Sequence, residues 1–173
     1  MKHFTIGIVC SGNTCRSPLT AAWLREIVPS HVKVWTAGLN VSKESRKTKV
    51  GDEPLSVAMQ MGLSEGQICN LRTHRARSIK KERQKTDLLV WVTEPKMMGK
   101  KYGKGSLTRA GFMRKKAKDF GSVLLVIPEE DAGFKAKAAK APRWEILEAY
   151  NVQARNLRQW APVIQAFIPR KRK

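Results

Sequence analysis

The sequence has few cysteines, few acidic residues and no long apolar run. Its 173 residues include three cysteines, a number too small and too odd for a disulfide framework. We therefore expect the thiols to serve chemistry or core packing in a reducing compartment. No apolar segment approaches the ~20 residues that a bilayer-spanning helix needs, and the first residues lack a signal-peptide pattern. These features predict a cytoplasmic chain without a membrane span.

Two kinds of site are also excluded by what the sequence lacks. The cysteines and the three histidines show no ligand spacing for zinc. Gly103 and Gly105 follow no predicted strand, and no Gly-Lys-Ser/Thr follows them, so they do not form a nucleotide-binding loop. We expect neither a metal nor an organic cofactor.

Acidic side chains are outnumbered, with 14 Asp and Glu against 34 Lys and Arg, which gives a formal charge of +20. Such a balance favours an acidic partner: a phosphorylated protein, a nucleic acid or an anionic surface. The basic stretch 100–118 holds only Tyr102 and Phe112 as aromatic residues for base stacking. Nucleic-acid recognition is therefore the less supported of these.

One short segment, residues 10–17, combines the features of an anion site. An apolar run over residues 4–9 ends at Cys10, and Ser17 followed by Pro18 is typical of a helix start. We call residues 10–17 the Cys10 loop. A tight turn between a strand and a helix directs backbone N–H groups inward at the positive end of the helix dipole. This environment stabilises a thiolate and makes Cys10 a nucleophile.

The remaining side chains of the loop fit a phosphate ligand. Arg16 carries a planar fork of donors that can bind two phosphate oxygens at once. The sequence therefore places a nucleophile, a ring of amides and a cation within eight residues. Transfer of a phosphoryl group needs these three, together with a proton for the leaving group.

The segment Cys-x5-Arg-Ser-Pro directly after the first strand, with Gly-Asn inside it, resembles the low-molecular-weight protein tyrosine phosphatases. The segment His74-Arg75-Ala76-Arg77 is similar to a second conserved string of that family. The resemblance implies a phosphotyrosine phosphatase I-like fold and hydrolysis through a phosphocysteine on Cys10. It also implies a phosphotyrosine-bearing protein as substrate, and the excess of Lys and Arg favours an acidic one.

The resemblance further implies a role for each matching residue. His74 would support the loop from behind, Asn13 would hold its strained shape, and Ser17 would hydrogen-bond the Cys10 sulfur. The expected phosphate-binding residues are Ser11, Gly12, Asn13, Thr14, Cys15, Arg16 and Ser17.

The proton donor is less clearly marked. The family carries Asp-Pro-aromatic after its fourth strand, where this chain has Pro128-Glu129-Glu130-Asp131-Ala132-Gly133-Phe134. We favour Asp131 as the general acid, because it has the family's residue type within an altered motif. Glu129 is the alternative, because it aligns without a gap when Ile127-Pro128 is the anchor. The family's aromatic pair is missing, with only Phe134 nearby.

Cys15 has two interpretations. It lies five residues after Cys10, and a reversible disulfide between the two would protect the nucleophile from over-oxidation, as in similar phosphatases. Alternatively, Cys15 is a small buried side chain beneath the loop.

Two other functions compete with the phosphatase. Arsenate reduction on a related fold needs a downstream redox pair, but the segment after the third strand, residues 93–97, contains no cysteine. A phosphate- or nucleic-acid-binding module that has lost turnover is the second alternative, motivated by the basic charge and the altered acid loop.

The apolar runs predict an α/β fold: a single doubly wound domain over residues 1–168, with helices on both faces of a four-stranded parallel sheet. Residues 169–173 should form a disordered basic tail. The expected strands are residues 4–9, 32–36, 87–92 and 122–127, and the expected helices are 17–28, 54–63, 78–85, 94–102 and 144–167, with a mobile link over 135–140.

Overall fold

The structure is a computed structural model that describes residues 3–42, 46, 48–103 and 106–169. The predicted basic tail lies outside the described residues from position 170 onward. Within the described part, no helix has the length and apolar character needed to cross a bilayer. In chain order the elements are β1 (Phe4–Cys10), α1 (Arg16–Ile27), β2 (Val32–Gly38), α2 (Asp52–Gln60), α3 (Glu65–Thr73), the 3-10 helix η2 (Ile79–Lys81), β3 (Leu88–Thr93), α4 (Pro95–Met98), α5 (Arg109–Phe120), β4 (Val123–Pro128), α6 (Ala132–Ala138) and α7 (Arg143–Gln165).

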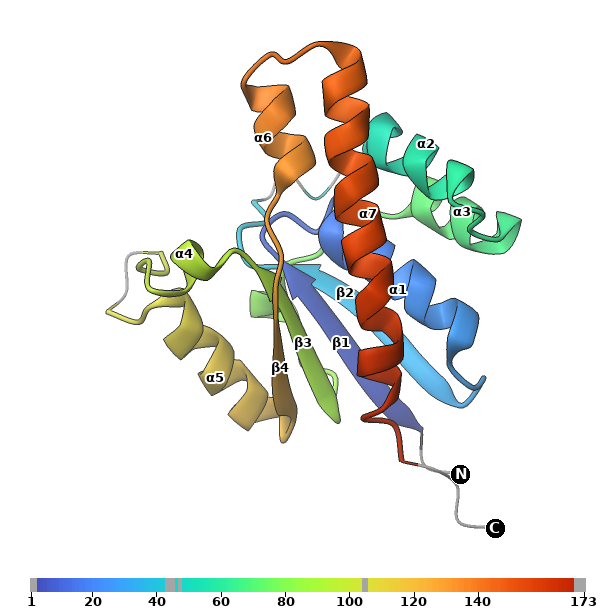
Figure 1. The fold of residues 1–173 in the computed structure, drawn as a ribbon. Helices are drawn as coiled ribbons and strands as arrows, with labels where there is room; N and C mark the ends of the chain where they lie inside the picture. The colour runs from blue at the N-terminus through green and yellow to red at the C-terminus, as the bar shows by residue number, and fades with distance from the viewer. Residues whose placement is uncertain (1–2, 43–45, 47, 104–105, 170–173) are drawn as a thin grey trace.

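The four strands form one parallel sheet in the order β2-β1-β3-β4. Strand β1 is central, so that Ile8 pairs with Thr36 of β2 on one side and with Val90 of β3 on the other. Because all strands run the same way, their carboxyl ends meet at one edge, where Cys10 ends β1 (Figure 1). The predicted four-stranded parallel sheet is confirmed.

Helices cover both faces of the sheet, as predicted (Figure 1). On one face, Ile6 and Ile8 of β1 pack in a core with side chains of α1, α3 and α7. On the other face, Val9 packs in a second core with Met113 and Phe120 of α5. Alternate residues of β1 therefore serve opposite cores, and Cys10 belongs to the face of α1 and α7.

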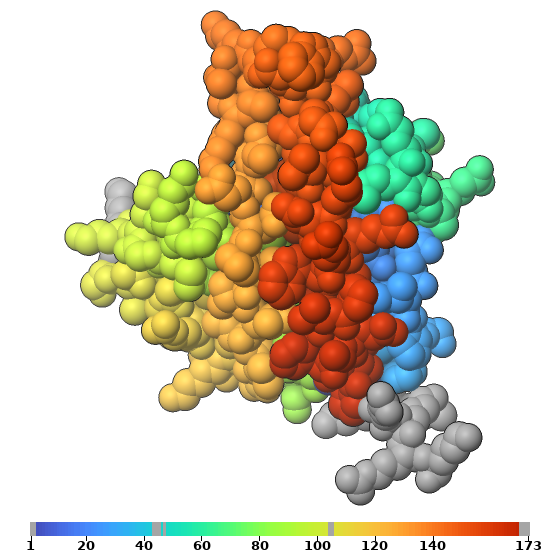
Figure 2. All heavy atoms as spheres, in the orientation of Figure 1, coloured from blue at the N-terminus to red at the C-terminus, as the bar shows by residue number. Residues whose placement is uncertain are grey.

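The predicted mobile link over residues 135–140 is wrong, because α6 runs through most of it. Alanine and lysine are strong helix formers, so this composition favours a helix once one side of it can pack. Gly133 provides that contact, since it approaches the ring of Tyr150 on α7 too closely for any larger side chain. Figures 1 and 2 show α6 beside the first half of α7, beyond the carboxyl ends of the strands.

The basic stretch 100–118 contains a helix that the prediction missed. The hydroxyl of Thr108 accepts a hydrogen bond from the N–H of Gly111 (3.1 Å) and caps the start of α5. Gly121, with φ of 69°, ends it in the left-handed conformation that favours glycine. These capping signals lie in the sequence, but the dense lysines masked the apolar spacing of the helix.

Three further helical segments differ from the prediction. Helix α3 was missed, the predicted helix 78–85 is only the single 3-10 turn η2, and the predicted helix 94–102 is reduced to α4. Each segment is short and polar, and such helices form through tertiary contacts more than through their own spacing.

Gly7 provides a test of the packing on the second core. A Cβ at this position would lie 2.3 Å from the indole of Trp35, the residue of β2 that pairs with Gly7. That ring cannot move easily, because its N–H donates to Thr86 (3.2 Å) and its edge packs against Phe120. We expect Gly7→Ala to lower the free energy of unfolding by about 1–3 kcal/mol in urea titrations.

Gly66 is the matched control. It lies in α3, and a Cβ there meets no atom within 4 Å. Gly66→Ala should raise the free energy of unfolding by about 0.5–1 kcal/mol, because alanine is the better helix former. Equal effects at the two glycines would contradict the packing proposed for Trp35.

Candidate active site

The Cys10 loop connects the end of β1 to the start of α1. Helix α1 begins at Arg16, so the predicted start with Ser17 as the N-cap is wrong. The hydroxyl of Ser17 is not available for capping, because it lies 3.1 Å from the Cys10 sulfur and accepts a hydrogen bond from Asn13 (2.9 Å). The N-cap residue is Cys15, and it makes no side-chain capping bond.

The Cys10 sulfur faces the inside of the loop. Cys10 is 2% exposed, and its Sγ accepts a hydrogen bond from the backbone N–H of Asn13 (3.3 Å) in addition to its contact with Ser17. Hydrogen bonds from an amide and a hydroxyl stabilise a thiolate more than a thiol. The local geometry therefore suits a sulfur nucleophile.

Asn13 holds the shape of the loop. It is fully buried, and its φ of 58° lies in the left-handed region that asparagine tolerates better than most residues. Its side chain uses both ends: Nδ2 donates to Ser17, and Oδ1 accepts from the backbone N–H of Arg77 (2.9 Å). The loop is thereby tied to a segment more than 60 residues away.

His74 lies behind the loop, at the position that the sequence predicts. Its Nε2 is 2.9 Å from the backbone oxygen of Asn13 and therefore donates to it. Burial lowers the pKa of His74, and the neighbouring charges of Arg77, Arg25 and Arg75 lower it further. The hydrogen bond with Asn13 opposes this shift but does not reverse it. A neutral imidazole is therefore favoured at neutral pH.

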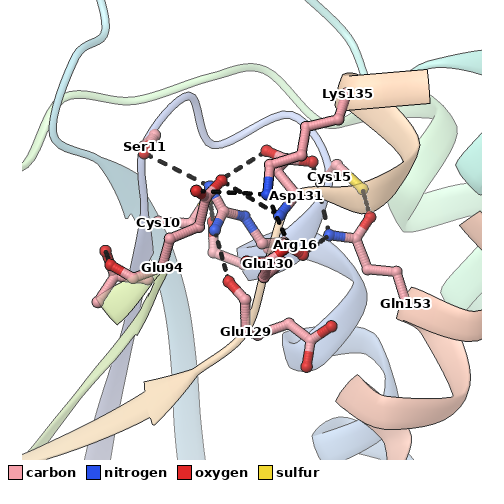
Figure 3. A network of polar contacts seen from close by, with 12 residues as sticks. Cys10, Ser11, Cys15, Arg16, Glu94, Glu129, Glu130, Asp131, Lys135 and Gln153 are labelled. Carbon is pink, nitrogen blue, oxygen red and sulfur yellow. Dashed lines mark hydrogen bonds and ion pairs between the residues drawn. The ribbon is translucent and has the colours of Figure 1, made fainter. Parts of the chain in front are cut away.

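Arg16 spans the site from the loop to the segment after β4. Its side chain is almost completely buried, and it donates to the backbone oxygen of Glu129 (3.0 Å) and to the hydroxyl of Ser11 (3.4 Å). It also forms an ion pair with Asp131, with 3.1 Å between Nη2 and Oδ2 (Figure 3). The buried Nε of Arg16 has no partner among the described residues. An anion in the loop would supply one.

The two candidate acids point in different directions (Figure 3). Asp131 contacts Arg16 through its carboxylate, whereas only the backbone oxygen of Glu129 does so. The carboxyl of Glu129 lies 3.4 Å from the amide nitrogen of Asn156 on α7. Burial raises the pKa of Glu129, although its hydrogen bond with Asn156 lowers it. The structure thus brings Asp131, and not the carboxyl of Glu129, to the guanidinium of the loop.

Sequence reasoning missed two buried residues that hold the segment around Asp131. Glu94, directly after β3, accepts from the backbone N–H of Asp131 (3.4 Å) and pairs with Lys96 and Lys135. Burial acts to raise the pKa of Glu94, but the hydrogen bonds and the lysine charges outweigh it and lower that pKa. Its place at the carboxyl end of a parallel strand is the signal that could have identified it.

Gln153 is the second missed residue, and nothing in the local sequence of α7 marks it. It is 1% exposed, and its amide nitrogen donates to the backbone oxygen of Glu130 (2.6 Å). Its amide oxygen accepts from the thiol of Cys15 (3.7 Å). Gln153 therefore joins the Cys10 loop to the segment after β4 (Figure 3).

Cys15 is a free thiol in this arrangement, as is Cys10. Burial raises the pKa of Cys15 well above its usual value, and the negative charges of Asp131 and Cys10 raise it further, against the opposing charge of Arg16. The thiol of Cys15 is therefore held in its protonated form at neutral pH. A disulfide with Cys10 stays a prediction, and its formation would break the contact with Gln153.

The described residues contain no group of three or more His, Cys, Asp or Glu side chains placed to hold a metal ion. The polar groups that surround the Cys10 sulfur and Arg16 include the amide of Asn13, the hydroxyls of Ser17 and Ser11, and the carboxylate of Asp131. Donors of this kind bind an oxyanion.

Comparisons with known proteins agree with this geometry. The family model described as low molecular weight phosphotyrosine protein phosphatase matches residues 5–116. The match includes the Cys10 loop and His74, and it ends before Asp131. Among individually curated proteins, none matches this chain.

Solved structures share the fold. Wzb from Vibrio vulnificus, in complex with benzylphosphonate, is 16% identical with a TM-score of 0.59 and covers 94% of this chain and 99% of that one. The Erwinia amylovora tyrosine phosphatase AmsI is 20% identical, with a TM-score of 0.58 and coverages of 94% and 93%. An arsenate reductase in its phosphate-binding state is 14% identical, with a TM-score of 0.60 and coverages of 96% and 99%.

The lowered pKa of His74 predicts a pH dependence of stability. In the unfolded chain a histidine binds a proton below about pH 6.5, whereas in the folded chain His74 resists protonation. The unfolded state then binds more protons, so the free energy of unfolding should fall as the pH decreases below about 6.5. Urea midpoints at pH 7.5 and pH 5.5 measure this change.

His74→Gln should reduce the difference between the two midpoints, because a glutamine amide can still donate to Asn13 and does not titrate. His3→Gln, at an exposed position near the other end of the sheet, should leave the difference as it is in the native chain. A full pH dependence in His74→Gln would show that other groups cause it.

Proposed function

Because the chain belongs to the low molecular weight phosphotyrosine protein phosphatase family, we propose that it hydrolyses phosphotyrosine in proteins through a phosphocysteine on Cys10. In this proposal Arg16 and the backbone amides of the Cys10 loop bind the phosphate. Asp131 is the general acid and then the general base.

The observation that carries the proposal is the direction of the Cys10 sulfur. It points into the loop, where the N–H of Asn13 and the hydroxyl of Ser17 contact it. The same two contacts that favour the thiolate before the reaction favour it as the leaving group when the phosphocysteine is hydrolysed. A cysteine that served only to fill the core would not need them.

In the first step the Cys10 sulfur attacks phosphorus, an S–P bond forms, and the bond from phosphorus to the aryl oxygen breaks. The equatorial oxygens of the transition state receive hydrogen bonds from the loop amides and Arg16, which are already in place. The unpartnered Nε of Arg16 and its Nη2 are the donors for this role.

Asp131 supplies the proton that the leaving oxygen takes. In the empty site it is paired with Arg16, and phosphate oxygens compete for the same guanidinium. The carboxylate released from that pair takes up a proton from solvent and gives it to the leaving oxygen as the P–O bond breaks. In the second step the carboxylate takes a proton from water, the water oxygen attacks phosphorus, and the P–S bond breaks to restore Cys10.

The substrate class rests on charge and on one aromatic side chain. The formal charge of +20 favours an acidic phosphoprotein over a neutral one. Phe134, in the first turn of α6 and three residues after Asp131, is 62% exposed and available to an aryl ring. The Vibrio vulnificus neighbour was solved with a benzyl-substituted phosphonate, which has the same combination of ring and phosphate-like group.

The nucleophile is tested with Cys10→Ser. We expect hydrolysis of p-nitrophenyl phosphate to fall to background, because a serine hydroxyl is not ionised at neutral pH. Acid quenching of the native chain with ³²P-labelled substrate should trap a phosphorylated protein that Cys10→Ser does not form. Retained binding without any turnover in the native chain would support the phosphate-binding module instead.

The general acid is tested with two leaving groups of different basicity. Asp131→Asn should slow hydrolysis of phenyl phosphate by about 100-fold or more, and p-nitrophenyl phosphate less, because nitrophenolate leaves without a proton. Glu129→Gln is the matched control and should change neither rate by more than a few-fold. The reverse pattern would assign the acid role to Glu129.

A further inference from the structure

A pocket lined by arginines lies at the outer edge of β2, separate from the Cys10 loop. Its volume is about 420 Å³, which is within the range of about 300–1,000 Å³ typical of small-molecule sites. Strand β2 is the edge strand of the sheet, and residues near the end of α1 and in the segment after α3 complete the walls. We call it the arginine pocket; its lining residues are Arg25, Val34, Trp35, Thr36, Thr73, His74, Arg75 and Arg77.

Within the described part of the chain, the three arginines of this pocket have no acidic partner. None of the lining residues is Asp or Glu, and within the described part of the chain Arg25, Arg75 and Arg77 form no ion pair. Arginine is normally the residue of paired charge or of anion recognition. Arg75 donates to the backbone oxygens of Thr73 (3.1 Å) and His74 (2.9 Å), which are neutral partners. The guanidiniums therefore keep a net positive charge around the cavity.

Arg25 adds a second observation, because its charge is partly buried without compensation. Its Nη2 donates to the backbone oxygen of Val34 (2.8 Å), which is its one hydrogen bond to the described residues. Burial lowers the pKa of Arg25. A buried cation with only a neutral partner is costly, and an anion in the adjacent cavity would offset that cost.

The combined effect of these three charges is also seen in the pKa of His74. The charges of Arg77, Arg25 and Arg75 all act to lower its pKa, after burial. Because all three arginines disfavour protonation of the same imidazole, all three lie near the part of the pocket wall that His74 forms.

We propose that the arginine pocket is a second anion site that binds the phosphoryl group of a small phosphorylated molecule or free phosphate. Guanidinium forks match the oxygens of a phosphoryl dianion. The volume leaves room for a small carrier group beside the phosphate. None of residues 10–17 lines the pocket, so the site does not depend on the proposed hydrolysis.

The pocket is connected to the Cys10 loop through two contacts with one residue. His74 lines the pocket and donates to the backbone oxygen of Asn13. Arg77 lines it too, and its backbone N–H donates to the side chain of Asn13. A ligand that moves His74 or Arg77 therefore acts on the residue that shapes the loop, and occupancy of either site should affect the other.

The test is a titration of ¹⁵N-labelled protein with inorganic phosphate at constant ionic strength, followed by amide shifts. The amides of Thr36, Thr73 and Arg75 report on the pocket, and those of Ser11 and Thr14 report on the loop. We expect both groups to shift and to saturate. Saturation of the pocket amides alone would support the second site and contradict the proposed function of the Cys10 loop.

The double variant Arg75→Gln/Arg77→Gln should weaken binding at the pocket amides by about tenfold or more, while the loop amides still saturate. Arg72→Gln/Arg83→Gln is the control, because it removes the same charge from exposed positions outside the pocket. Equal weakening in both double variants, or pocket shifts that never saturate, would show that phosphate acts only by general charge screening. Either result would overturn the proposal.

Two further experiments identify the ligand and show that it binds in the arginine pocket. In Cys10→Ser, tighter binding of ribose 5-phosphate than of phosphate indicates a phosphorylated metabolite, whereas equal binding indicates free phosphate; ribose alone should not bind. Occupancy should also raise the pKa of His74 measured by NMR, because the anion offsets the surrounding arginines. An unchanged His74 titration at saturation would place the ligand elsewhere.

Discussion

The geometry of the Cys10 loop depends on the buried side chain of Asn13. It holds Ser17 with one end and the backbone of Arg77 with the other, and its own carbonyl accepts from His74. These bonds keep a residue with positive φ in place. They also fix Ser17 beside Cys10, so the position of the sulfur is determined from outside the loop as well as within it.

The sheet could be predicted from the sequence because each strand is a compact, mostly apolar run, and β1 and β3 are buried along almost their whole length. The helices were harder. Helices α5 and α6 lie in lysine-rich segments, where apolar spacing is hidden, and they form because Thr108 caps one and Gly133 lets the other approach Tyr150. Capping and close approach depend on single residues, and the apolar periodicity of a segment does not reveal them.

The candidate site divides in a similar way. The residues of the Cys10 loop are adjacent in sequence, so the sequence could show that they meet in one turn between a strand and a helix. Gln153 could not, because it reaches the loop from α7, more than 130 residues later. The choice between Glu129 and Asp131 depended on where β4 ends and how the chain leaves it. Only the fold shows that one carboxyl faces α7 and the other faces Arg16.

The ion pair between Arg16 and Asp131 gives the empty site a counter-ion of its own. Entry of a ligand is then an exchange of one anion for another at a nearly buried guanidinium. A monoanion would only replace the charge that the carboxylate already provides. In the proposed reaction a dianion would bring one more negative charge to the amides of the loop, so this arrangement would favour a phosphate dianion over singly charged competitors such as chloride or carboxylates.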